Sequence, residues 1–259
     1  MSGQAFFWNL GNVTRPLRVF YLGRSMDVAL HEHHLTQICV GLNEPVRVHR
    51  GSGEPVEHRA VLIPTDAPHL IATASDSPIA VLYLSSETTA LRAKTGAGPE
   101  AITLDERLLD ALRDAHDREV HADEAAALFA DVLAASVGTI DESIRDARVR
   151  SVVGHLRRDP VAKHSATSLA GRVALSTRRL SELFREETGL PIRRYVVFLR
   201  LRIAIARVLR GSSLTEAAHA AGFSDLAHLS HAFRDMFGMS PSFGLEPARR
   251  PRFVLTDDP

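Results

Sequence analysis

The C-terminal half of the chain carries one pattern twice, and this repeat constrains the fold more than any other feature. Each copy has the pattern of a short helix, a tight turn (173–175 and 221–223) and a second helix that begins near Ser176 or Asp225. The repeat therefore predicts two helix-turn-helix units. The second copy follows 49 residues after the first: Leu180, Ser181, Phe184, Arg185 and Gly189 recur as Leu229, Ser230, Phe233, Arg234 and Gly238.

The second helix of each unit divides into a buried and an outward face. Residues four apart share one helix face, so Leu180 with Phe184, and Leu229 with Phe233, form the expected buried face. The neighbouring positions must point outward, where arginine can pair with guanine, glutamate can accept from cytosine and serine can serve several bases. The chemistry favours direct base reading by the first unit, and shape or phosphate contacts by the second. The expected DNA-contacting residues are Arg178, Ser181 and Glu182 in the first unit, and Ala227, Ser230 and His231 in the second.

The segment 191–211 between the two units predicts an amphipathic helix that begins with proline and ends with glycine. At 1.5 Å per residue, such a helix spans roughly 30 Å, close to the roughly 34 Å turn of B-DNA. It could therefore hold the two reading helices in successive major grooves. We expect Arg200 and Arg202 on this helix to contact phosphates. The predicted N-caps of the surrounding short helices are Ser168, Ser176, Ser213 and Asp225.

The overall balance of charge hides a division between the two halves. Residues 1–143 contain 11 Lys+Arg against 20 Asp+Glu, a net charge of −9, whereas residues 144–252 contain 20 against 9, a net charge of +11. A basic segment of this kind is typical of a module that binds double-stranded DNA. Either helix pair alone could be a simple packed hairpin. Two copies joined by a helix of this length in a basic segment favour DNA binding.

The run from Arg200 to Ser242 resembles the DNA-binding domain of AraC/XylS-type transcriptional regulators. This resemblance implies an N-terminal domain for effector binding or dimerisation, which in that family is frequently a cupin-like barrel. His231 departs from the family pattern, where a basic or larger polar residue is frequent. The residues that carry the resemblance are Arg200, Leu201, Ala204, Ala218, Gly222, Phe223, Phe233, Phe237, Gly238, Ser240 and Pro241.

The N-terminal half shows the alternating short apolar runs and Gly/Pro turns of a β domain between residues 17 and 85. Apolar residues at helical spacing then predict two helices, which could cover the β domain or pair with a second copy of the chain. The predicted fold class is α+β and multidomain. We expect a cupin-like β-barrel for effector sensing (1–95), a helical connector (96–142) and an all-α domain with two helix-turn-helix units (143–250).

Three histidines and a glutamine form a candidate ligand site in the β domain. His31, His33 and Gln37 share one strand face, and His69 follows Pro64 by five residues. The segments resemble the two cupin motifs, with Gln37 in place of glutamate and Asp66 in place of glycine. Together these four side chains could bind a divalent transition metal, or line a polar effector pocket without metal. The expected apolar wall of that pocket consists of Ile38, Val40, Ile63 and Leu82.

These features predict a transcriptional regulator controlled by a small-molecule or metal effector, acting as an activator or a repressor. The alternative is a metal-dependent cupin enzyme fused to a DNA-binding module. We expect no enzymatic activity and no required cofactor, because Gly-rich phosphate loops, nucleophile elbows and HExxH motifs are absent from the sequence. The single cysteine, Cys39, is expected in the core, with redox sensing as the alternative. The expected location is the cytoplasm without membrane contact, and the expected partners are double-stranded DNA, a small-molecule effector, a second copy of the chain and, for an activator, RNA polymerase.

Overall fold

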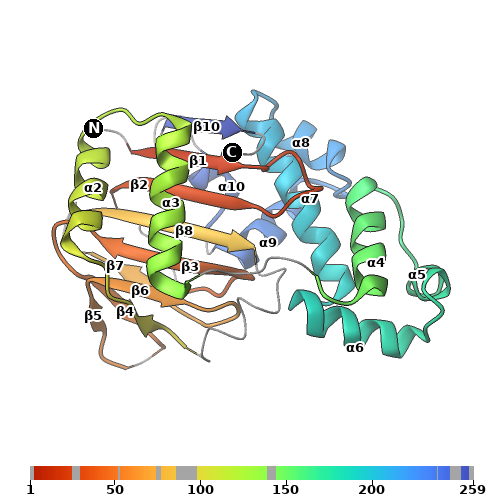
Figure 1. Cartoon of the computed structure of the whole chain (residues 1–259). Coiled ribbons are helices and arrows are strands. Elements are labelled where there is room, and N and C mark those ends of the chain that lie inside the picture. Colours follow the sequence, from red (N-terminus) through yellow and green to blue (C-terminus); the bar gives the residue numbers. More distant parts are fainter. Residues whose placement is uncertain are drawn as a thin grey trace.

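A seven-stranded sheet, formed by the N-terminal half together with one strand from the C-terminal end, is the centre of the N-terminal domain in the computed structural model (Figure 1). Its strand order is β10-β1-β2-β8-β3-β6-β9, and every pairing except the parallel β1–β10 pair is antiparallel. The strands are β1 (Gln4–Trp8), β2 (Arg18–Arg24), β3 (Leu35–Gly41), β6 (Ala60–Ile63), β8 (Pro78–Ser85), β9 (Glu100–Ala101) and β10 (Arg252–Thr256). The structure describes residues 3–24, 30–51, 53–73, 77–85, 98–138, 144–237, 239–245 and 252–256.

A second sheet of three strands contains β5 (Val56–His58), β4 (Val46–His49) and β7 (Leu70–Ala72), in that order. Apolar side chains between the two sheets, among them Val46, Val61, Ile71 and Val81, form one core cluster. The strand-rich domain that the sequence predicts is therefore confirmed. The strand pairings of the described residues form two open sheets rather than one closed ring. The predicted barrel is therefore not confirmed.

Both faces of the large sheet are covered, which explains why β8 reads as a continuous apolar run. Helices α2 (Glu106–Asp117) and α3 (Ala122–Val137) lie across one face (Figure 1). There Leu112, Phe129 and Val132 pack against Phe20 and Leu82. The two predicted helices thus cover the sheet within the chain. Pairing with a second copy of the chain stays a prediction.

The C-terminal half is helical, as predicted, and lies against the opposite side and one end of the sheet (Figure 1). Its helices are α4 (Ala147–Arg158), α5 (Ala166–Arg172), α6 (Thr177–Thr188), α7 (Ile192–Leu209), α8 (Leu214–Ala220), α9 (Leu226–Phe237) and α10 (Pro241–Gly244). None of the described helices is long and apolar enough to cross a membrane.

Polar caps set where these helices begin. Ser176 and Ser213 accept backbone N–H bonds at the starts of α6 and α8, and Asp225 accepts from the backbone of His228 at the start of α9. The predicted cap Ser168 is wrong, because Ser165 occupies that place and accepts the N–H of Ser168. Ser168 lies inside α5 instead.

The last strand crosses back from the helical half to the sheet. In β10, residues 252–256 pair with residues 4–8 of β1 in parallel. The all-α description of the C-terminal half therefore omits one element, which lies beyond its predicted end at residue 250. Gly238 of the repeat and both predicted domain boundaries, at 95/96 and 142/143, lie outside the described residues.

Candidate DNA-reading surface and effector cavity

Helices α5–α6 and α8–α9 are the two predicted helix-turn-helix units. Both turns close in the same way: the N–H of Leu175 donates to the carbonyl of Ala170 at 3.1 Å, and the N–H of Phe223 donates to Ala218 at 3.0 Å. A left-handed residue precedes each closure, Ala174 with φ 51° in the first unit and Gly222 with φ 80° in the second. The pattern repeat therefore reflects a repeated backbone.

The first reading helix presents the predicted residues to solvent. Leu180 and Phe184 are fully buried, while Arg178, Ser181 and Glu182 are exposed. The Nε of Arg178 donates to Glu182 Oε1 at 2.9 Å, an exposed i,i+4 ion pair that contributes little stability. These three side chains are positioned for base contacts, which stay a prediction.

The second reading helix is less open. Leu229 and Phe233 are buried as predicted, Ala227 and His231 are exposed, and Ser230 is half-buried. His231 Nδ1 lies 3.0 Å from Asp235 Oδ2. The base contacts of this helix also stay a prediction.

Arg202 is not a phosphate contact in this arrangement, and that prediction is wrong. Its side chain is 1% exposed because α7 packs against the β1–β2 loop of the N-terminal domain. Its Nη2 donates to the carbonyls of Arg15 at 2.9 Å and Asn12 at 3.0 Å, and also to that of Asn9. The guanidinium therefore joins the two domains instead of facing DNA.

Arg200 is likewise turned into the protein, which corrects its predicted phosphate contact. Its Nε donates to the carbonyl of Pro160 at 2.8 Å, and its Nη1 donates to Gly222 at 3.0 Å. Its Nη2 donates to Val161 and Ala162. Arg200 thus ties the segment before the first unit to the turn of the second.

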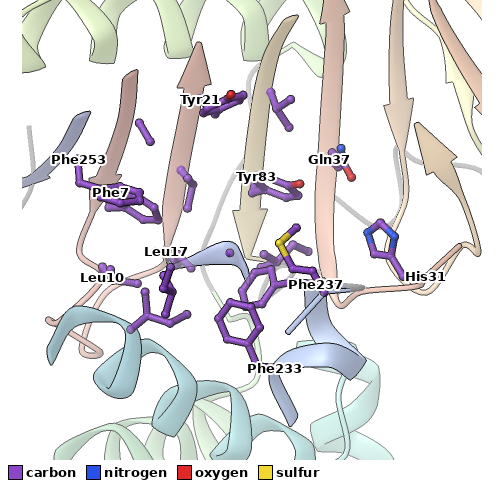
Figure 2. A pocket seen from close by; sticks show the side chains of 18 of the residues that line it. Phe7, Leu10, Leu17, Tyr21, His31, Gln37, Tyr83, Phe233, Phe237 and Phe253 are labelled. Atoms are coloured by element: carbon purple, nitrogen blue, oxygen red, sulfur yellow. The ribbon is translucent and has the colours of Figure 1, made fainter. Parts of the chain in front are cut away.

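An apolar cavity of about 160 Å³ lies between the sheet and the helical domain (Figure 2). The sheet supplies one wall, including Phe7, Tyr21 and Tyr83, and the helical domain supplies the other. The wall from the helical half consists of Ile205 on α7, Phe233 and Phe237 on α9, Met239, Gly244, Leu245 and, on β10, Phe253. The second reading helix is therefore part of the cavity.

A polar groove of about 770 Å³ lies beside this cavity, and His31 borders both. The groove runs between residues 30–34 and helices α7 and α9, and it contains Arg194 and His231. Arg194 Nη1 lies 3.1 Å from His34 Nε2, and His34 contacts Asp66. Burial opposes ionisation of Asp66, but His34, Arg194 and Arg185 outweigh it and lower the pKa of this carboxyl.

The structure brings together the four predicted ligand residues. His31, His33 and His69 offer ring nitrogens that all lie within 4.8 Å of one another. The Nε2 atoms of His33 and His69 lie 2.8 and 3.0 Å from Gln37 Oε1. His33, Gln37 and His69 are buried, and His31 is half-buried at the cavity edge.

Both buried histidines are neutral. Burial, together with the neighbouring imidazoles, lowers the pKa of His33 to about 3 and that of His69 to about 4. A neutral imidazole carries one N–H, and both Nδ1 atoms lie 2.8 Å from backbone carbonyls, of Leu35 and Ala67. The N–H therefore belongs on Nδ1, which leaves each Nε2 with a lone pair.

One orientation of the Gln37 amide satisfies every contact in this cluster. The structure has Gln37 Oε1 against the two Nε2 lone pairs and Gln37 Nε2 at 2.9 Å from Cys39 Sγ. Turning the amide over points its NH₂ group at the two lone pairs and lets its oxygen accept from the Cys39 thiol, so this is the orientation we assign. Burial raises the pKa of Cys39 to about 12, so the thiol keeps its proton. The cluster is thus complete without an ion. The same tautomers, with Nδ1–H bound to a carbonyl, also suit imidazoles that ligate metal.

The predicted apolar wall of the pocket is wrong. Ile38, Val40 and Leu82 lie on the opposite face of the sheet under α2 and α3, because successive strand residues point to opposite sides. Ile63 packs between the two sheets instead. On β3 the residues that do line the cavity share the face of Gln37, so the two-residue period of a strand could have identified Cys39 from the sequence. Tyr83 lies opposite Gln37 on β8, and predicting its place in the wall required knowing that these two strands pair. Predicting that Phe233 and Phe237 line the cavity required knowing how the helical domain contacts the sheet.

The geometry defines a class: a double helix-turn-helix domain docked on a strand-rich domain. Residues 169–243 match the family model of a helix-turn-helix domain. The HTH-type transcriptional activator RhaS of Pectobacterium carotovorum is 36% identical over 94 residues, 36% of this chain and 34% of that protein. The transcriptional activator RhrA of Rhizobium meliloti is 28% identical over 139 residues, 51% of this chain and 44% of that protein.

The C-terminal region of this chain therefore contains a helix-turn-helix domain that is similar to those of transcriptional activators, in agreement with the sequence resemblance. The match with RhaS spans about a third of that relative's length.

Solved structures of ToxT from Vibrio cholerae share the whole two-domain fold. One has a TM-score of 0.59 at 11% identity and covers 88% of this chain and 97% of that chain. ToxT with a bound unsaturated fatty acid has a TM-score of 0.58 at 13% identity, covering 89% of this chain and 94% of that chain. At this identity the similarity establishes the fold alone.

Proposed function

We propose that this protein is a sequence-specific DNA-binding transcriptional regulator whose DNA affinity depends on a small molecule bound between its domains. One observation carries the proposal: the second reading helix, α9, forms part of the cavity wall through Phe233 and Phe237. A ligand in the cavity would contact sheet and reading helix together. Ligand binding and domain docking would then be thermodynamically linked.

The comparisons support this function without supplying the ligand. RhaS and RhrA are described as transcriptional activators, and activation is the mode we propose here. A fatty acid occupies ToxT, which has the same fold. We take the N-terminal domain as a cupin-like binding domain without enzymatic activity. The proposed setting is the cytoplasm, and the further partners are a second copy of the chain and RNA polymerase.

A selection experiment with the full-length protein tests DNA binding. The protein is incubated with genomic fragments and with random DNA, and bound fragments are sequenced at two salt concentrations. We expect enrichment of a shared sequence and weaker binding at higher salt, because phosphate contacts release counterions. Equal recovery of genomic and random DNA would contradict sequence-specific regulation.

The histidine cluster supports a second candidate, in which a divalent transition metal is the effector. His31, His33 and His69 would supply three imidazole ligands and Gln37 an oxygen, with Oε1 instead of the NH₂ group turned toward the two Nε2 atoms. Metal analysis of the full-length protein tests this proposal. We expect the protein to contain close to one equivalent of metal and the His33→Ala variant to contain none. Metal-free protein whose thermal stability changes with neither chelator nor added zinc would exclude the metal effector.

A further inference from the structure

The size of the domain cavity limits its ligand. Its volume is about 160 Å³. An engineered apolar cavity of about 150 Å³ in another protein binds benzene. The body of a matching ligand is therefore close to a single ring, and a long acyl chain does not fit within this volume.

The cavity wall favours a flat aromatic ligand. Aromatic rings surround the cavity from both domains, and they already form tilted pairs: Phe233 with Phe237 at 4.6 Å, and Phe7 with Phe253 at 5.5 Å between ring centres. A further ring can join such pairs edge to face. The aromatic residues of the wall are Phe7, Tyr21, Tyr83, Phe233, Phe237 and Phe253.

The composition of the cavity wall disfavours an ionised ligand group. Asp, Glu, Lys and Arg are all absent from the lining that the described residues form. An unpaired carboxylate in such surroundings would lose its hydration without compensation. The ligand that the wall suits is therefore neutral.

One polar group in the cavity has no hydrogen-bond partner among the residues that the structure describes. The Tyr83 hydroxyl forms no hydrogen bond with any described residue, whereas the Tyr21 hydroxyl donates to the carbonyl of Arg24 at 2.7 Å. Burial raises the pKa of Tyr83 above its ordinary value, so the hydroxyl keeps its proton and can donate. Figure 2 shows Tyr83 between the sheet and Phe237.

We propose that the effector is a compact, neutral, single-ring aromatic molecule with one hydrogen-bonding group, held by the Tyr83 hydroxyl. The ring packs against Phe233 and Phe237 of α9, and the polar group meets Tyr83 on β8. This inference rests on the proposed effector-controlled function. It adds the chemical class of the ligand and the residue that orients it.

Binding of four probes to the full-length protein tests the ligand class. The probes are phenol, toluene, benzoate and palmitoleate, with affinities measured by calorimetry. We expect phenol to bind most tightly, since toluene lacks the polar group, benzoate is charged and palmitoleate is too long. Tighter binding of benzoate or palmitoleate, or binding of none of the probes, would overturn the proposal.

Two tyrosine variants test the anchor. Tyr83→Phe should weaken phenol about two- to tenfold, the range of a single hydrogen bond, and leave toluene unchanged. Tyr21→Phe is the matched control, because Tyr21 lines the same cavity but its hydroxyl is already bonded. Equal losses in both variants, or an equal loss for toluene, would overturn the role of Tyr83.

A DNA measurement separates this inference from the proposed function. Affinity for the selected DNA fragment is measured with and without saturating phenol. If phenol binds through Tyr83 but DNA affinity stays constant, the ligand class stands and effector control fails. If palmitoleate changes DNA affinity while phenol neither binds nor acts, effector control stands and the ligand class is overturned.

Discussion

The two helix-turn-helix units share a backbone but differ in their surroundings. In the first unit, Arg178, Ser181 and Glu182 are exposed and line neither the apolar cavity nor the polar groove. In the second unit, Phe233 and Phe237 complete the apolar cavity, and His231 borders the polar groove. The same motif thus faces solvent once and faces the N-terminal domain once.

This difference suggests a division of work within one domain. The positions of Arg178, Ser181 and Glu182 correspond to Ala227, Ser230 and His231 after the 49-residue offset. The first set is rich in groups that can read bases, and the second set is poorer. A helix that makes fewer base contacts can also form part of the effector cavity without much loss of sequence recognition. The first unit would then choose the site, and the second would set affinity in response to ligand.

Arg202→Met is the change with the largest expected effect, because it breaks the buried contact between α7, which connects the two units, and the N-terminal domain. The buried guanidinium binds three carbonyls of the β1–β2 loop, and a methionine leaves those carbonyls without donors. We expect a loss of about 3 kcal/mol in the free energy of unfolding, measured by urea denaturation.

Arg207→Met provides the control for Arg202→Met. Arg207 lies on the same helix but is exposed, so a change within about 0.5 kcal/mol is expected. A loss for Arg202→Met no larger than for Arg207→Met would show that the buried contact does not hold the domains together.

Arg178→Ala compares the reading power of the two units directly. It makes position 178 identical to its counterpart, Ala227. We expect a loss of roughly 1–3 kcal/mol in DNA binding and relaxed preference at one base position, if Arg178 pairs with guanine. Fluorescence anisotropy with single-base variants of the selected site measures both quantities.

Ser230→Ala in the second unit is the companion variant. We expect a smaller loss than for Arg178→Ala, since a single serine contact carries less than a bidentate arginine. Uniform weakening of Arg178→Ala across all sequences would assign Arg178 to phosphate. A larger loss for Ser230→Ala would reverse the proposed division of work.

Local patterns in the sequence predicted what local physics decides. The buried pairs Leu180–Phe184 and Leu229–Phe233 follow from helical period, and the caps Ser176 and Ser213 follow from the need to satisfy free N–H groups. The convergence of His31, His33, Gln37 and His69 also followed, because two short motifs supplied all four side chains. These features depend on few distant contacts.

Features that depend on how the domains meet were not predictable in the same way. Arg202 has the sequence signature of a surface cation, and only its position against residues 9–15 buries it. Strand β10 finds its partner 248 residues earlier in the register Gln4↔Arg252. Predicting the cavity wall required knowing which face of the sheet is covered by α2 and α3 and which by the helical domain. The two-residue period of a strand separates the two faces but does not say what covers each of them.

The turns of the two units allow the smallest effects to be compared. Ala174 and Gly222 both have left-handed backbones, with φ of 51° and 80°. A side chain at such a position costs roughly 1–2 kcal/mol, partly offset because glycine loses more conformational entropy on folding. Ala174 is exposed, so its methyl group gains no packing in return. The first turn is therefore strained where the second is relaxed.

Ala174→Gly should accordingly stabilise the protein by up to about 1 kcal/mol, and Gly222→Ala should destabilise it by about 1–2 kcal/mol. A Cβ at residue 222 would lie 3.0 Å from Val161 Cγ1 and 3.4 Å from Arg200 Nε. It would therefore add crowding to the backbone cost, next to the arginine that ties residues 160–162 to this turn. Urea denaturation of both variants measures the two shifts. Opposite signs would establish that the repeated turn is built with unequal strain, whereas destabilisation by both changes would show that Ala174 is held by more than its backbone.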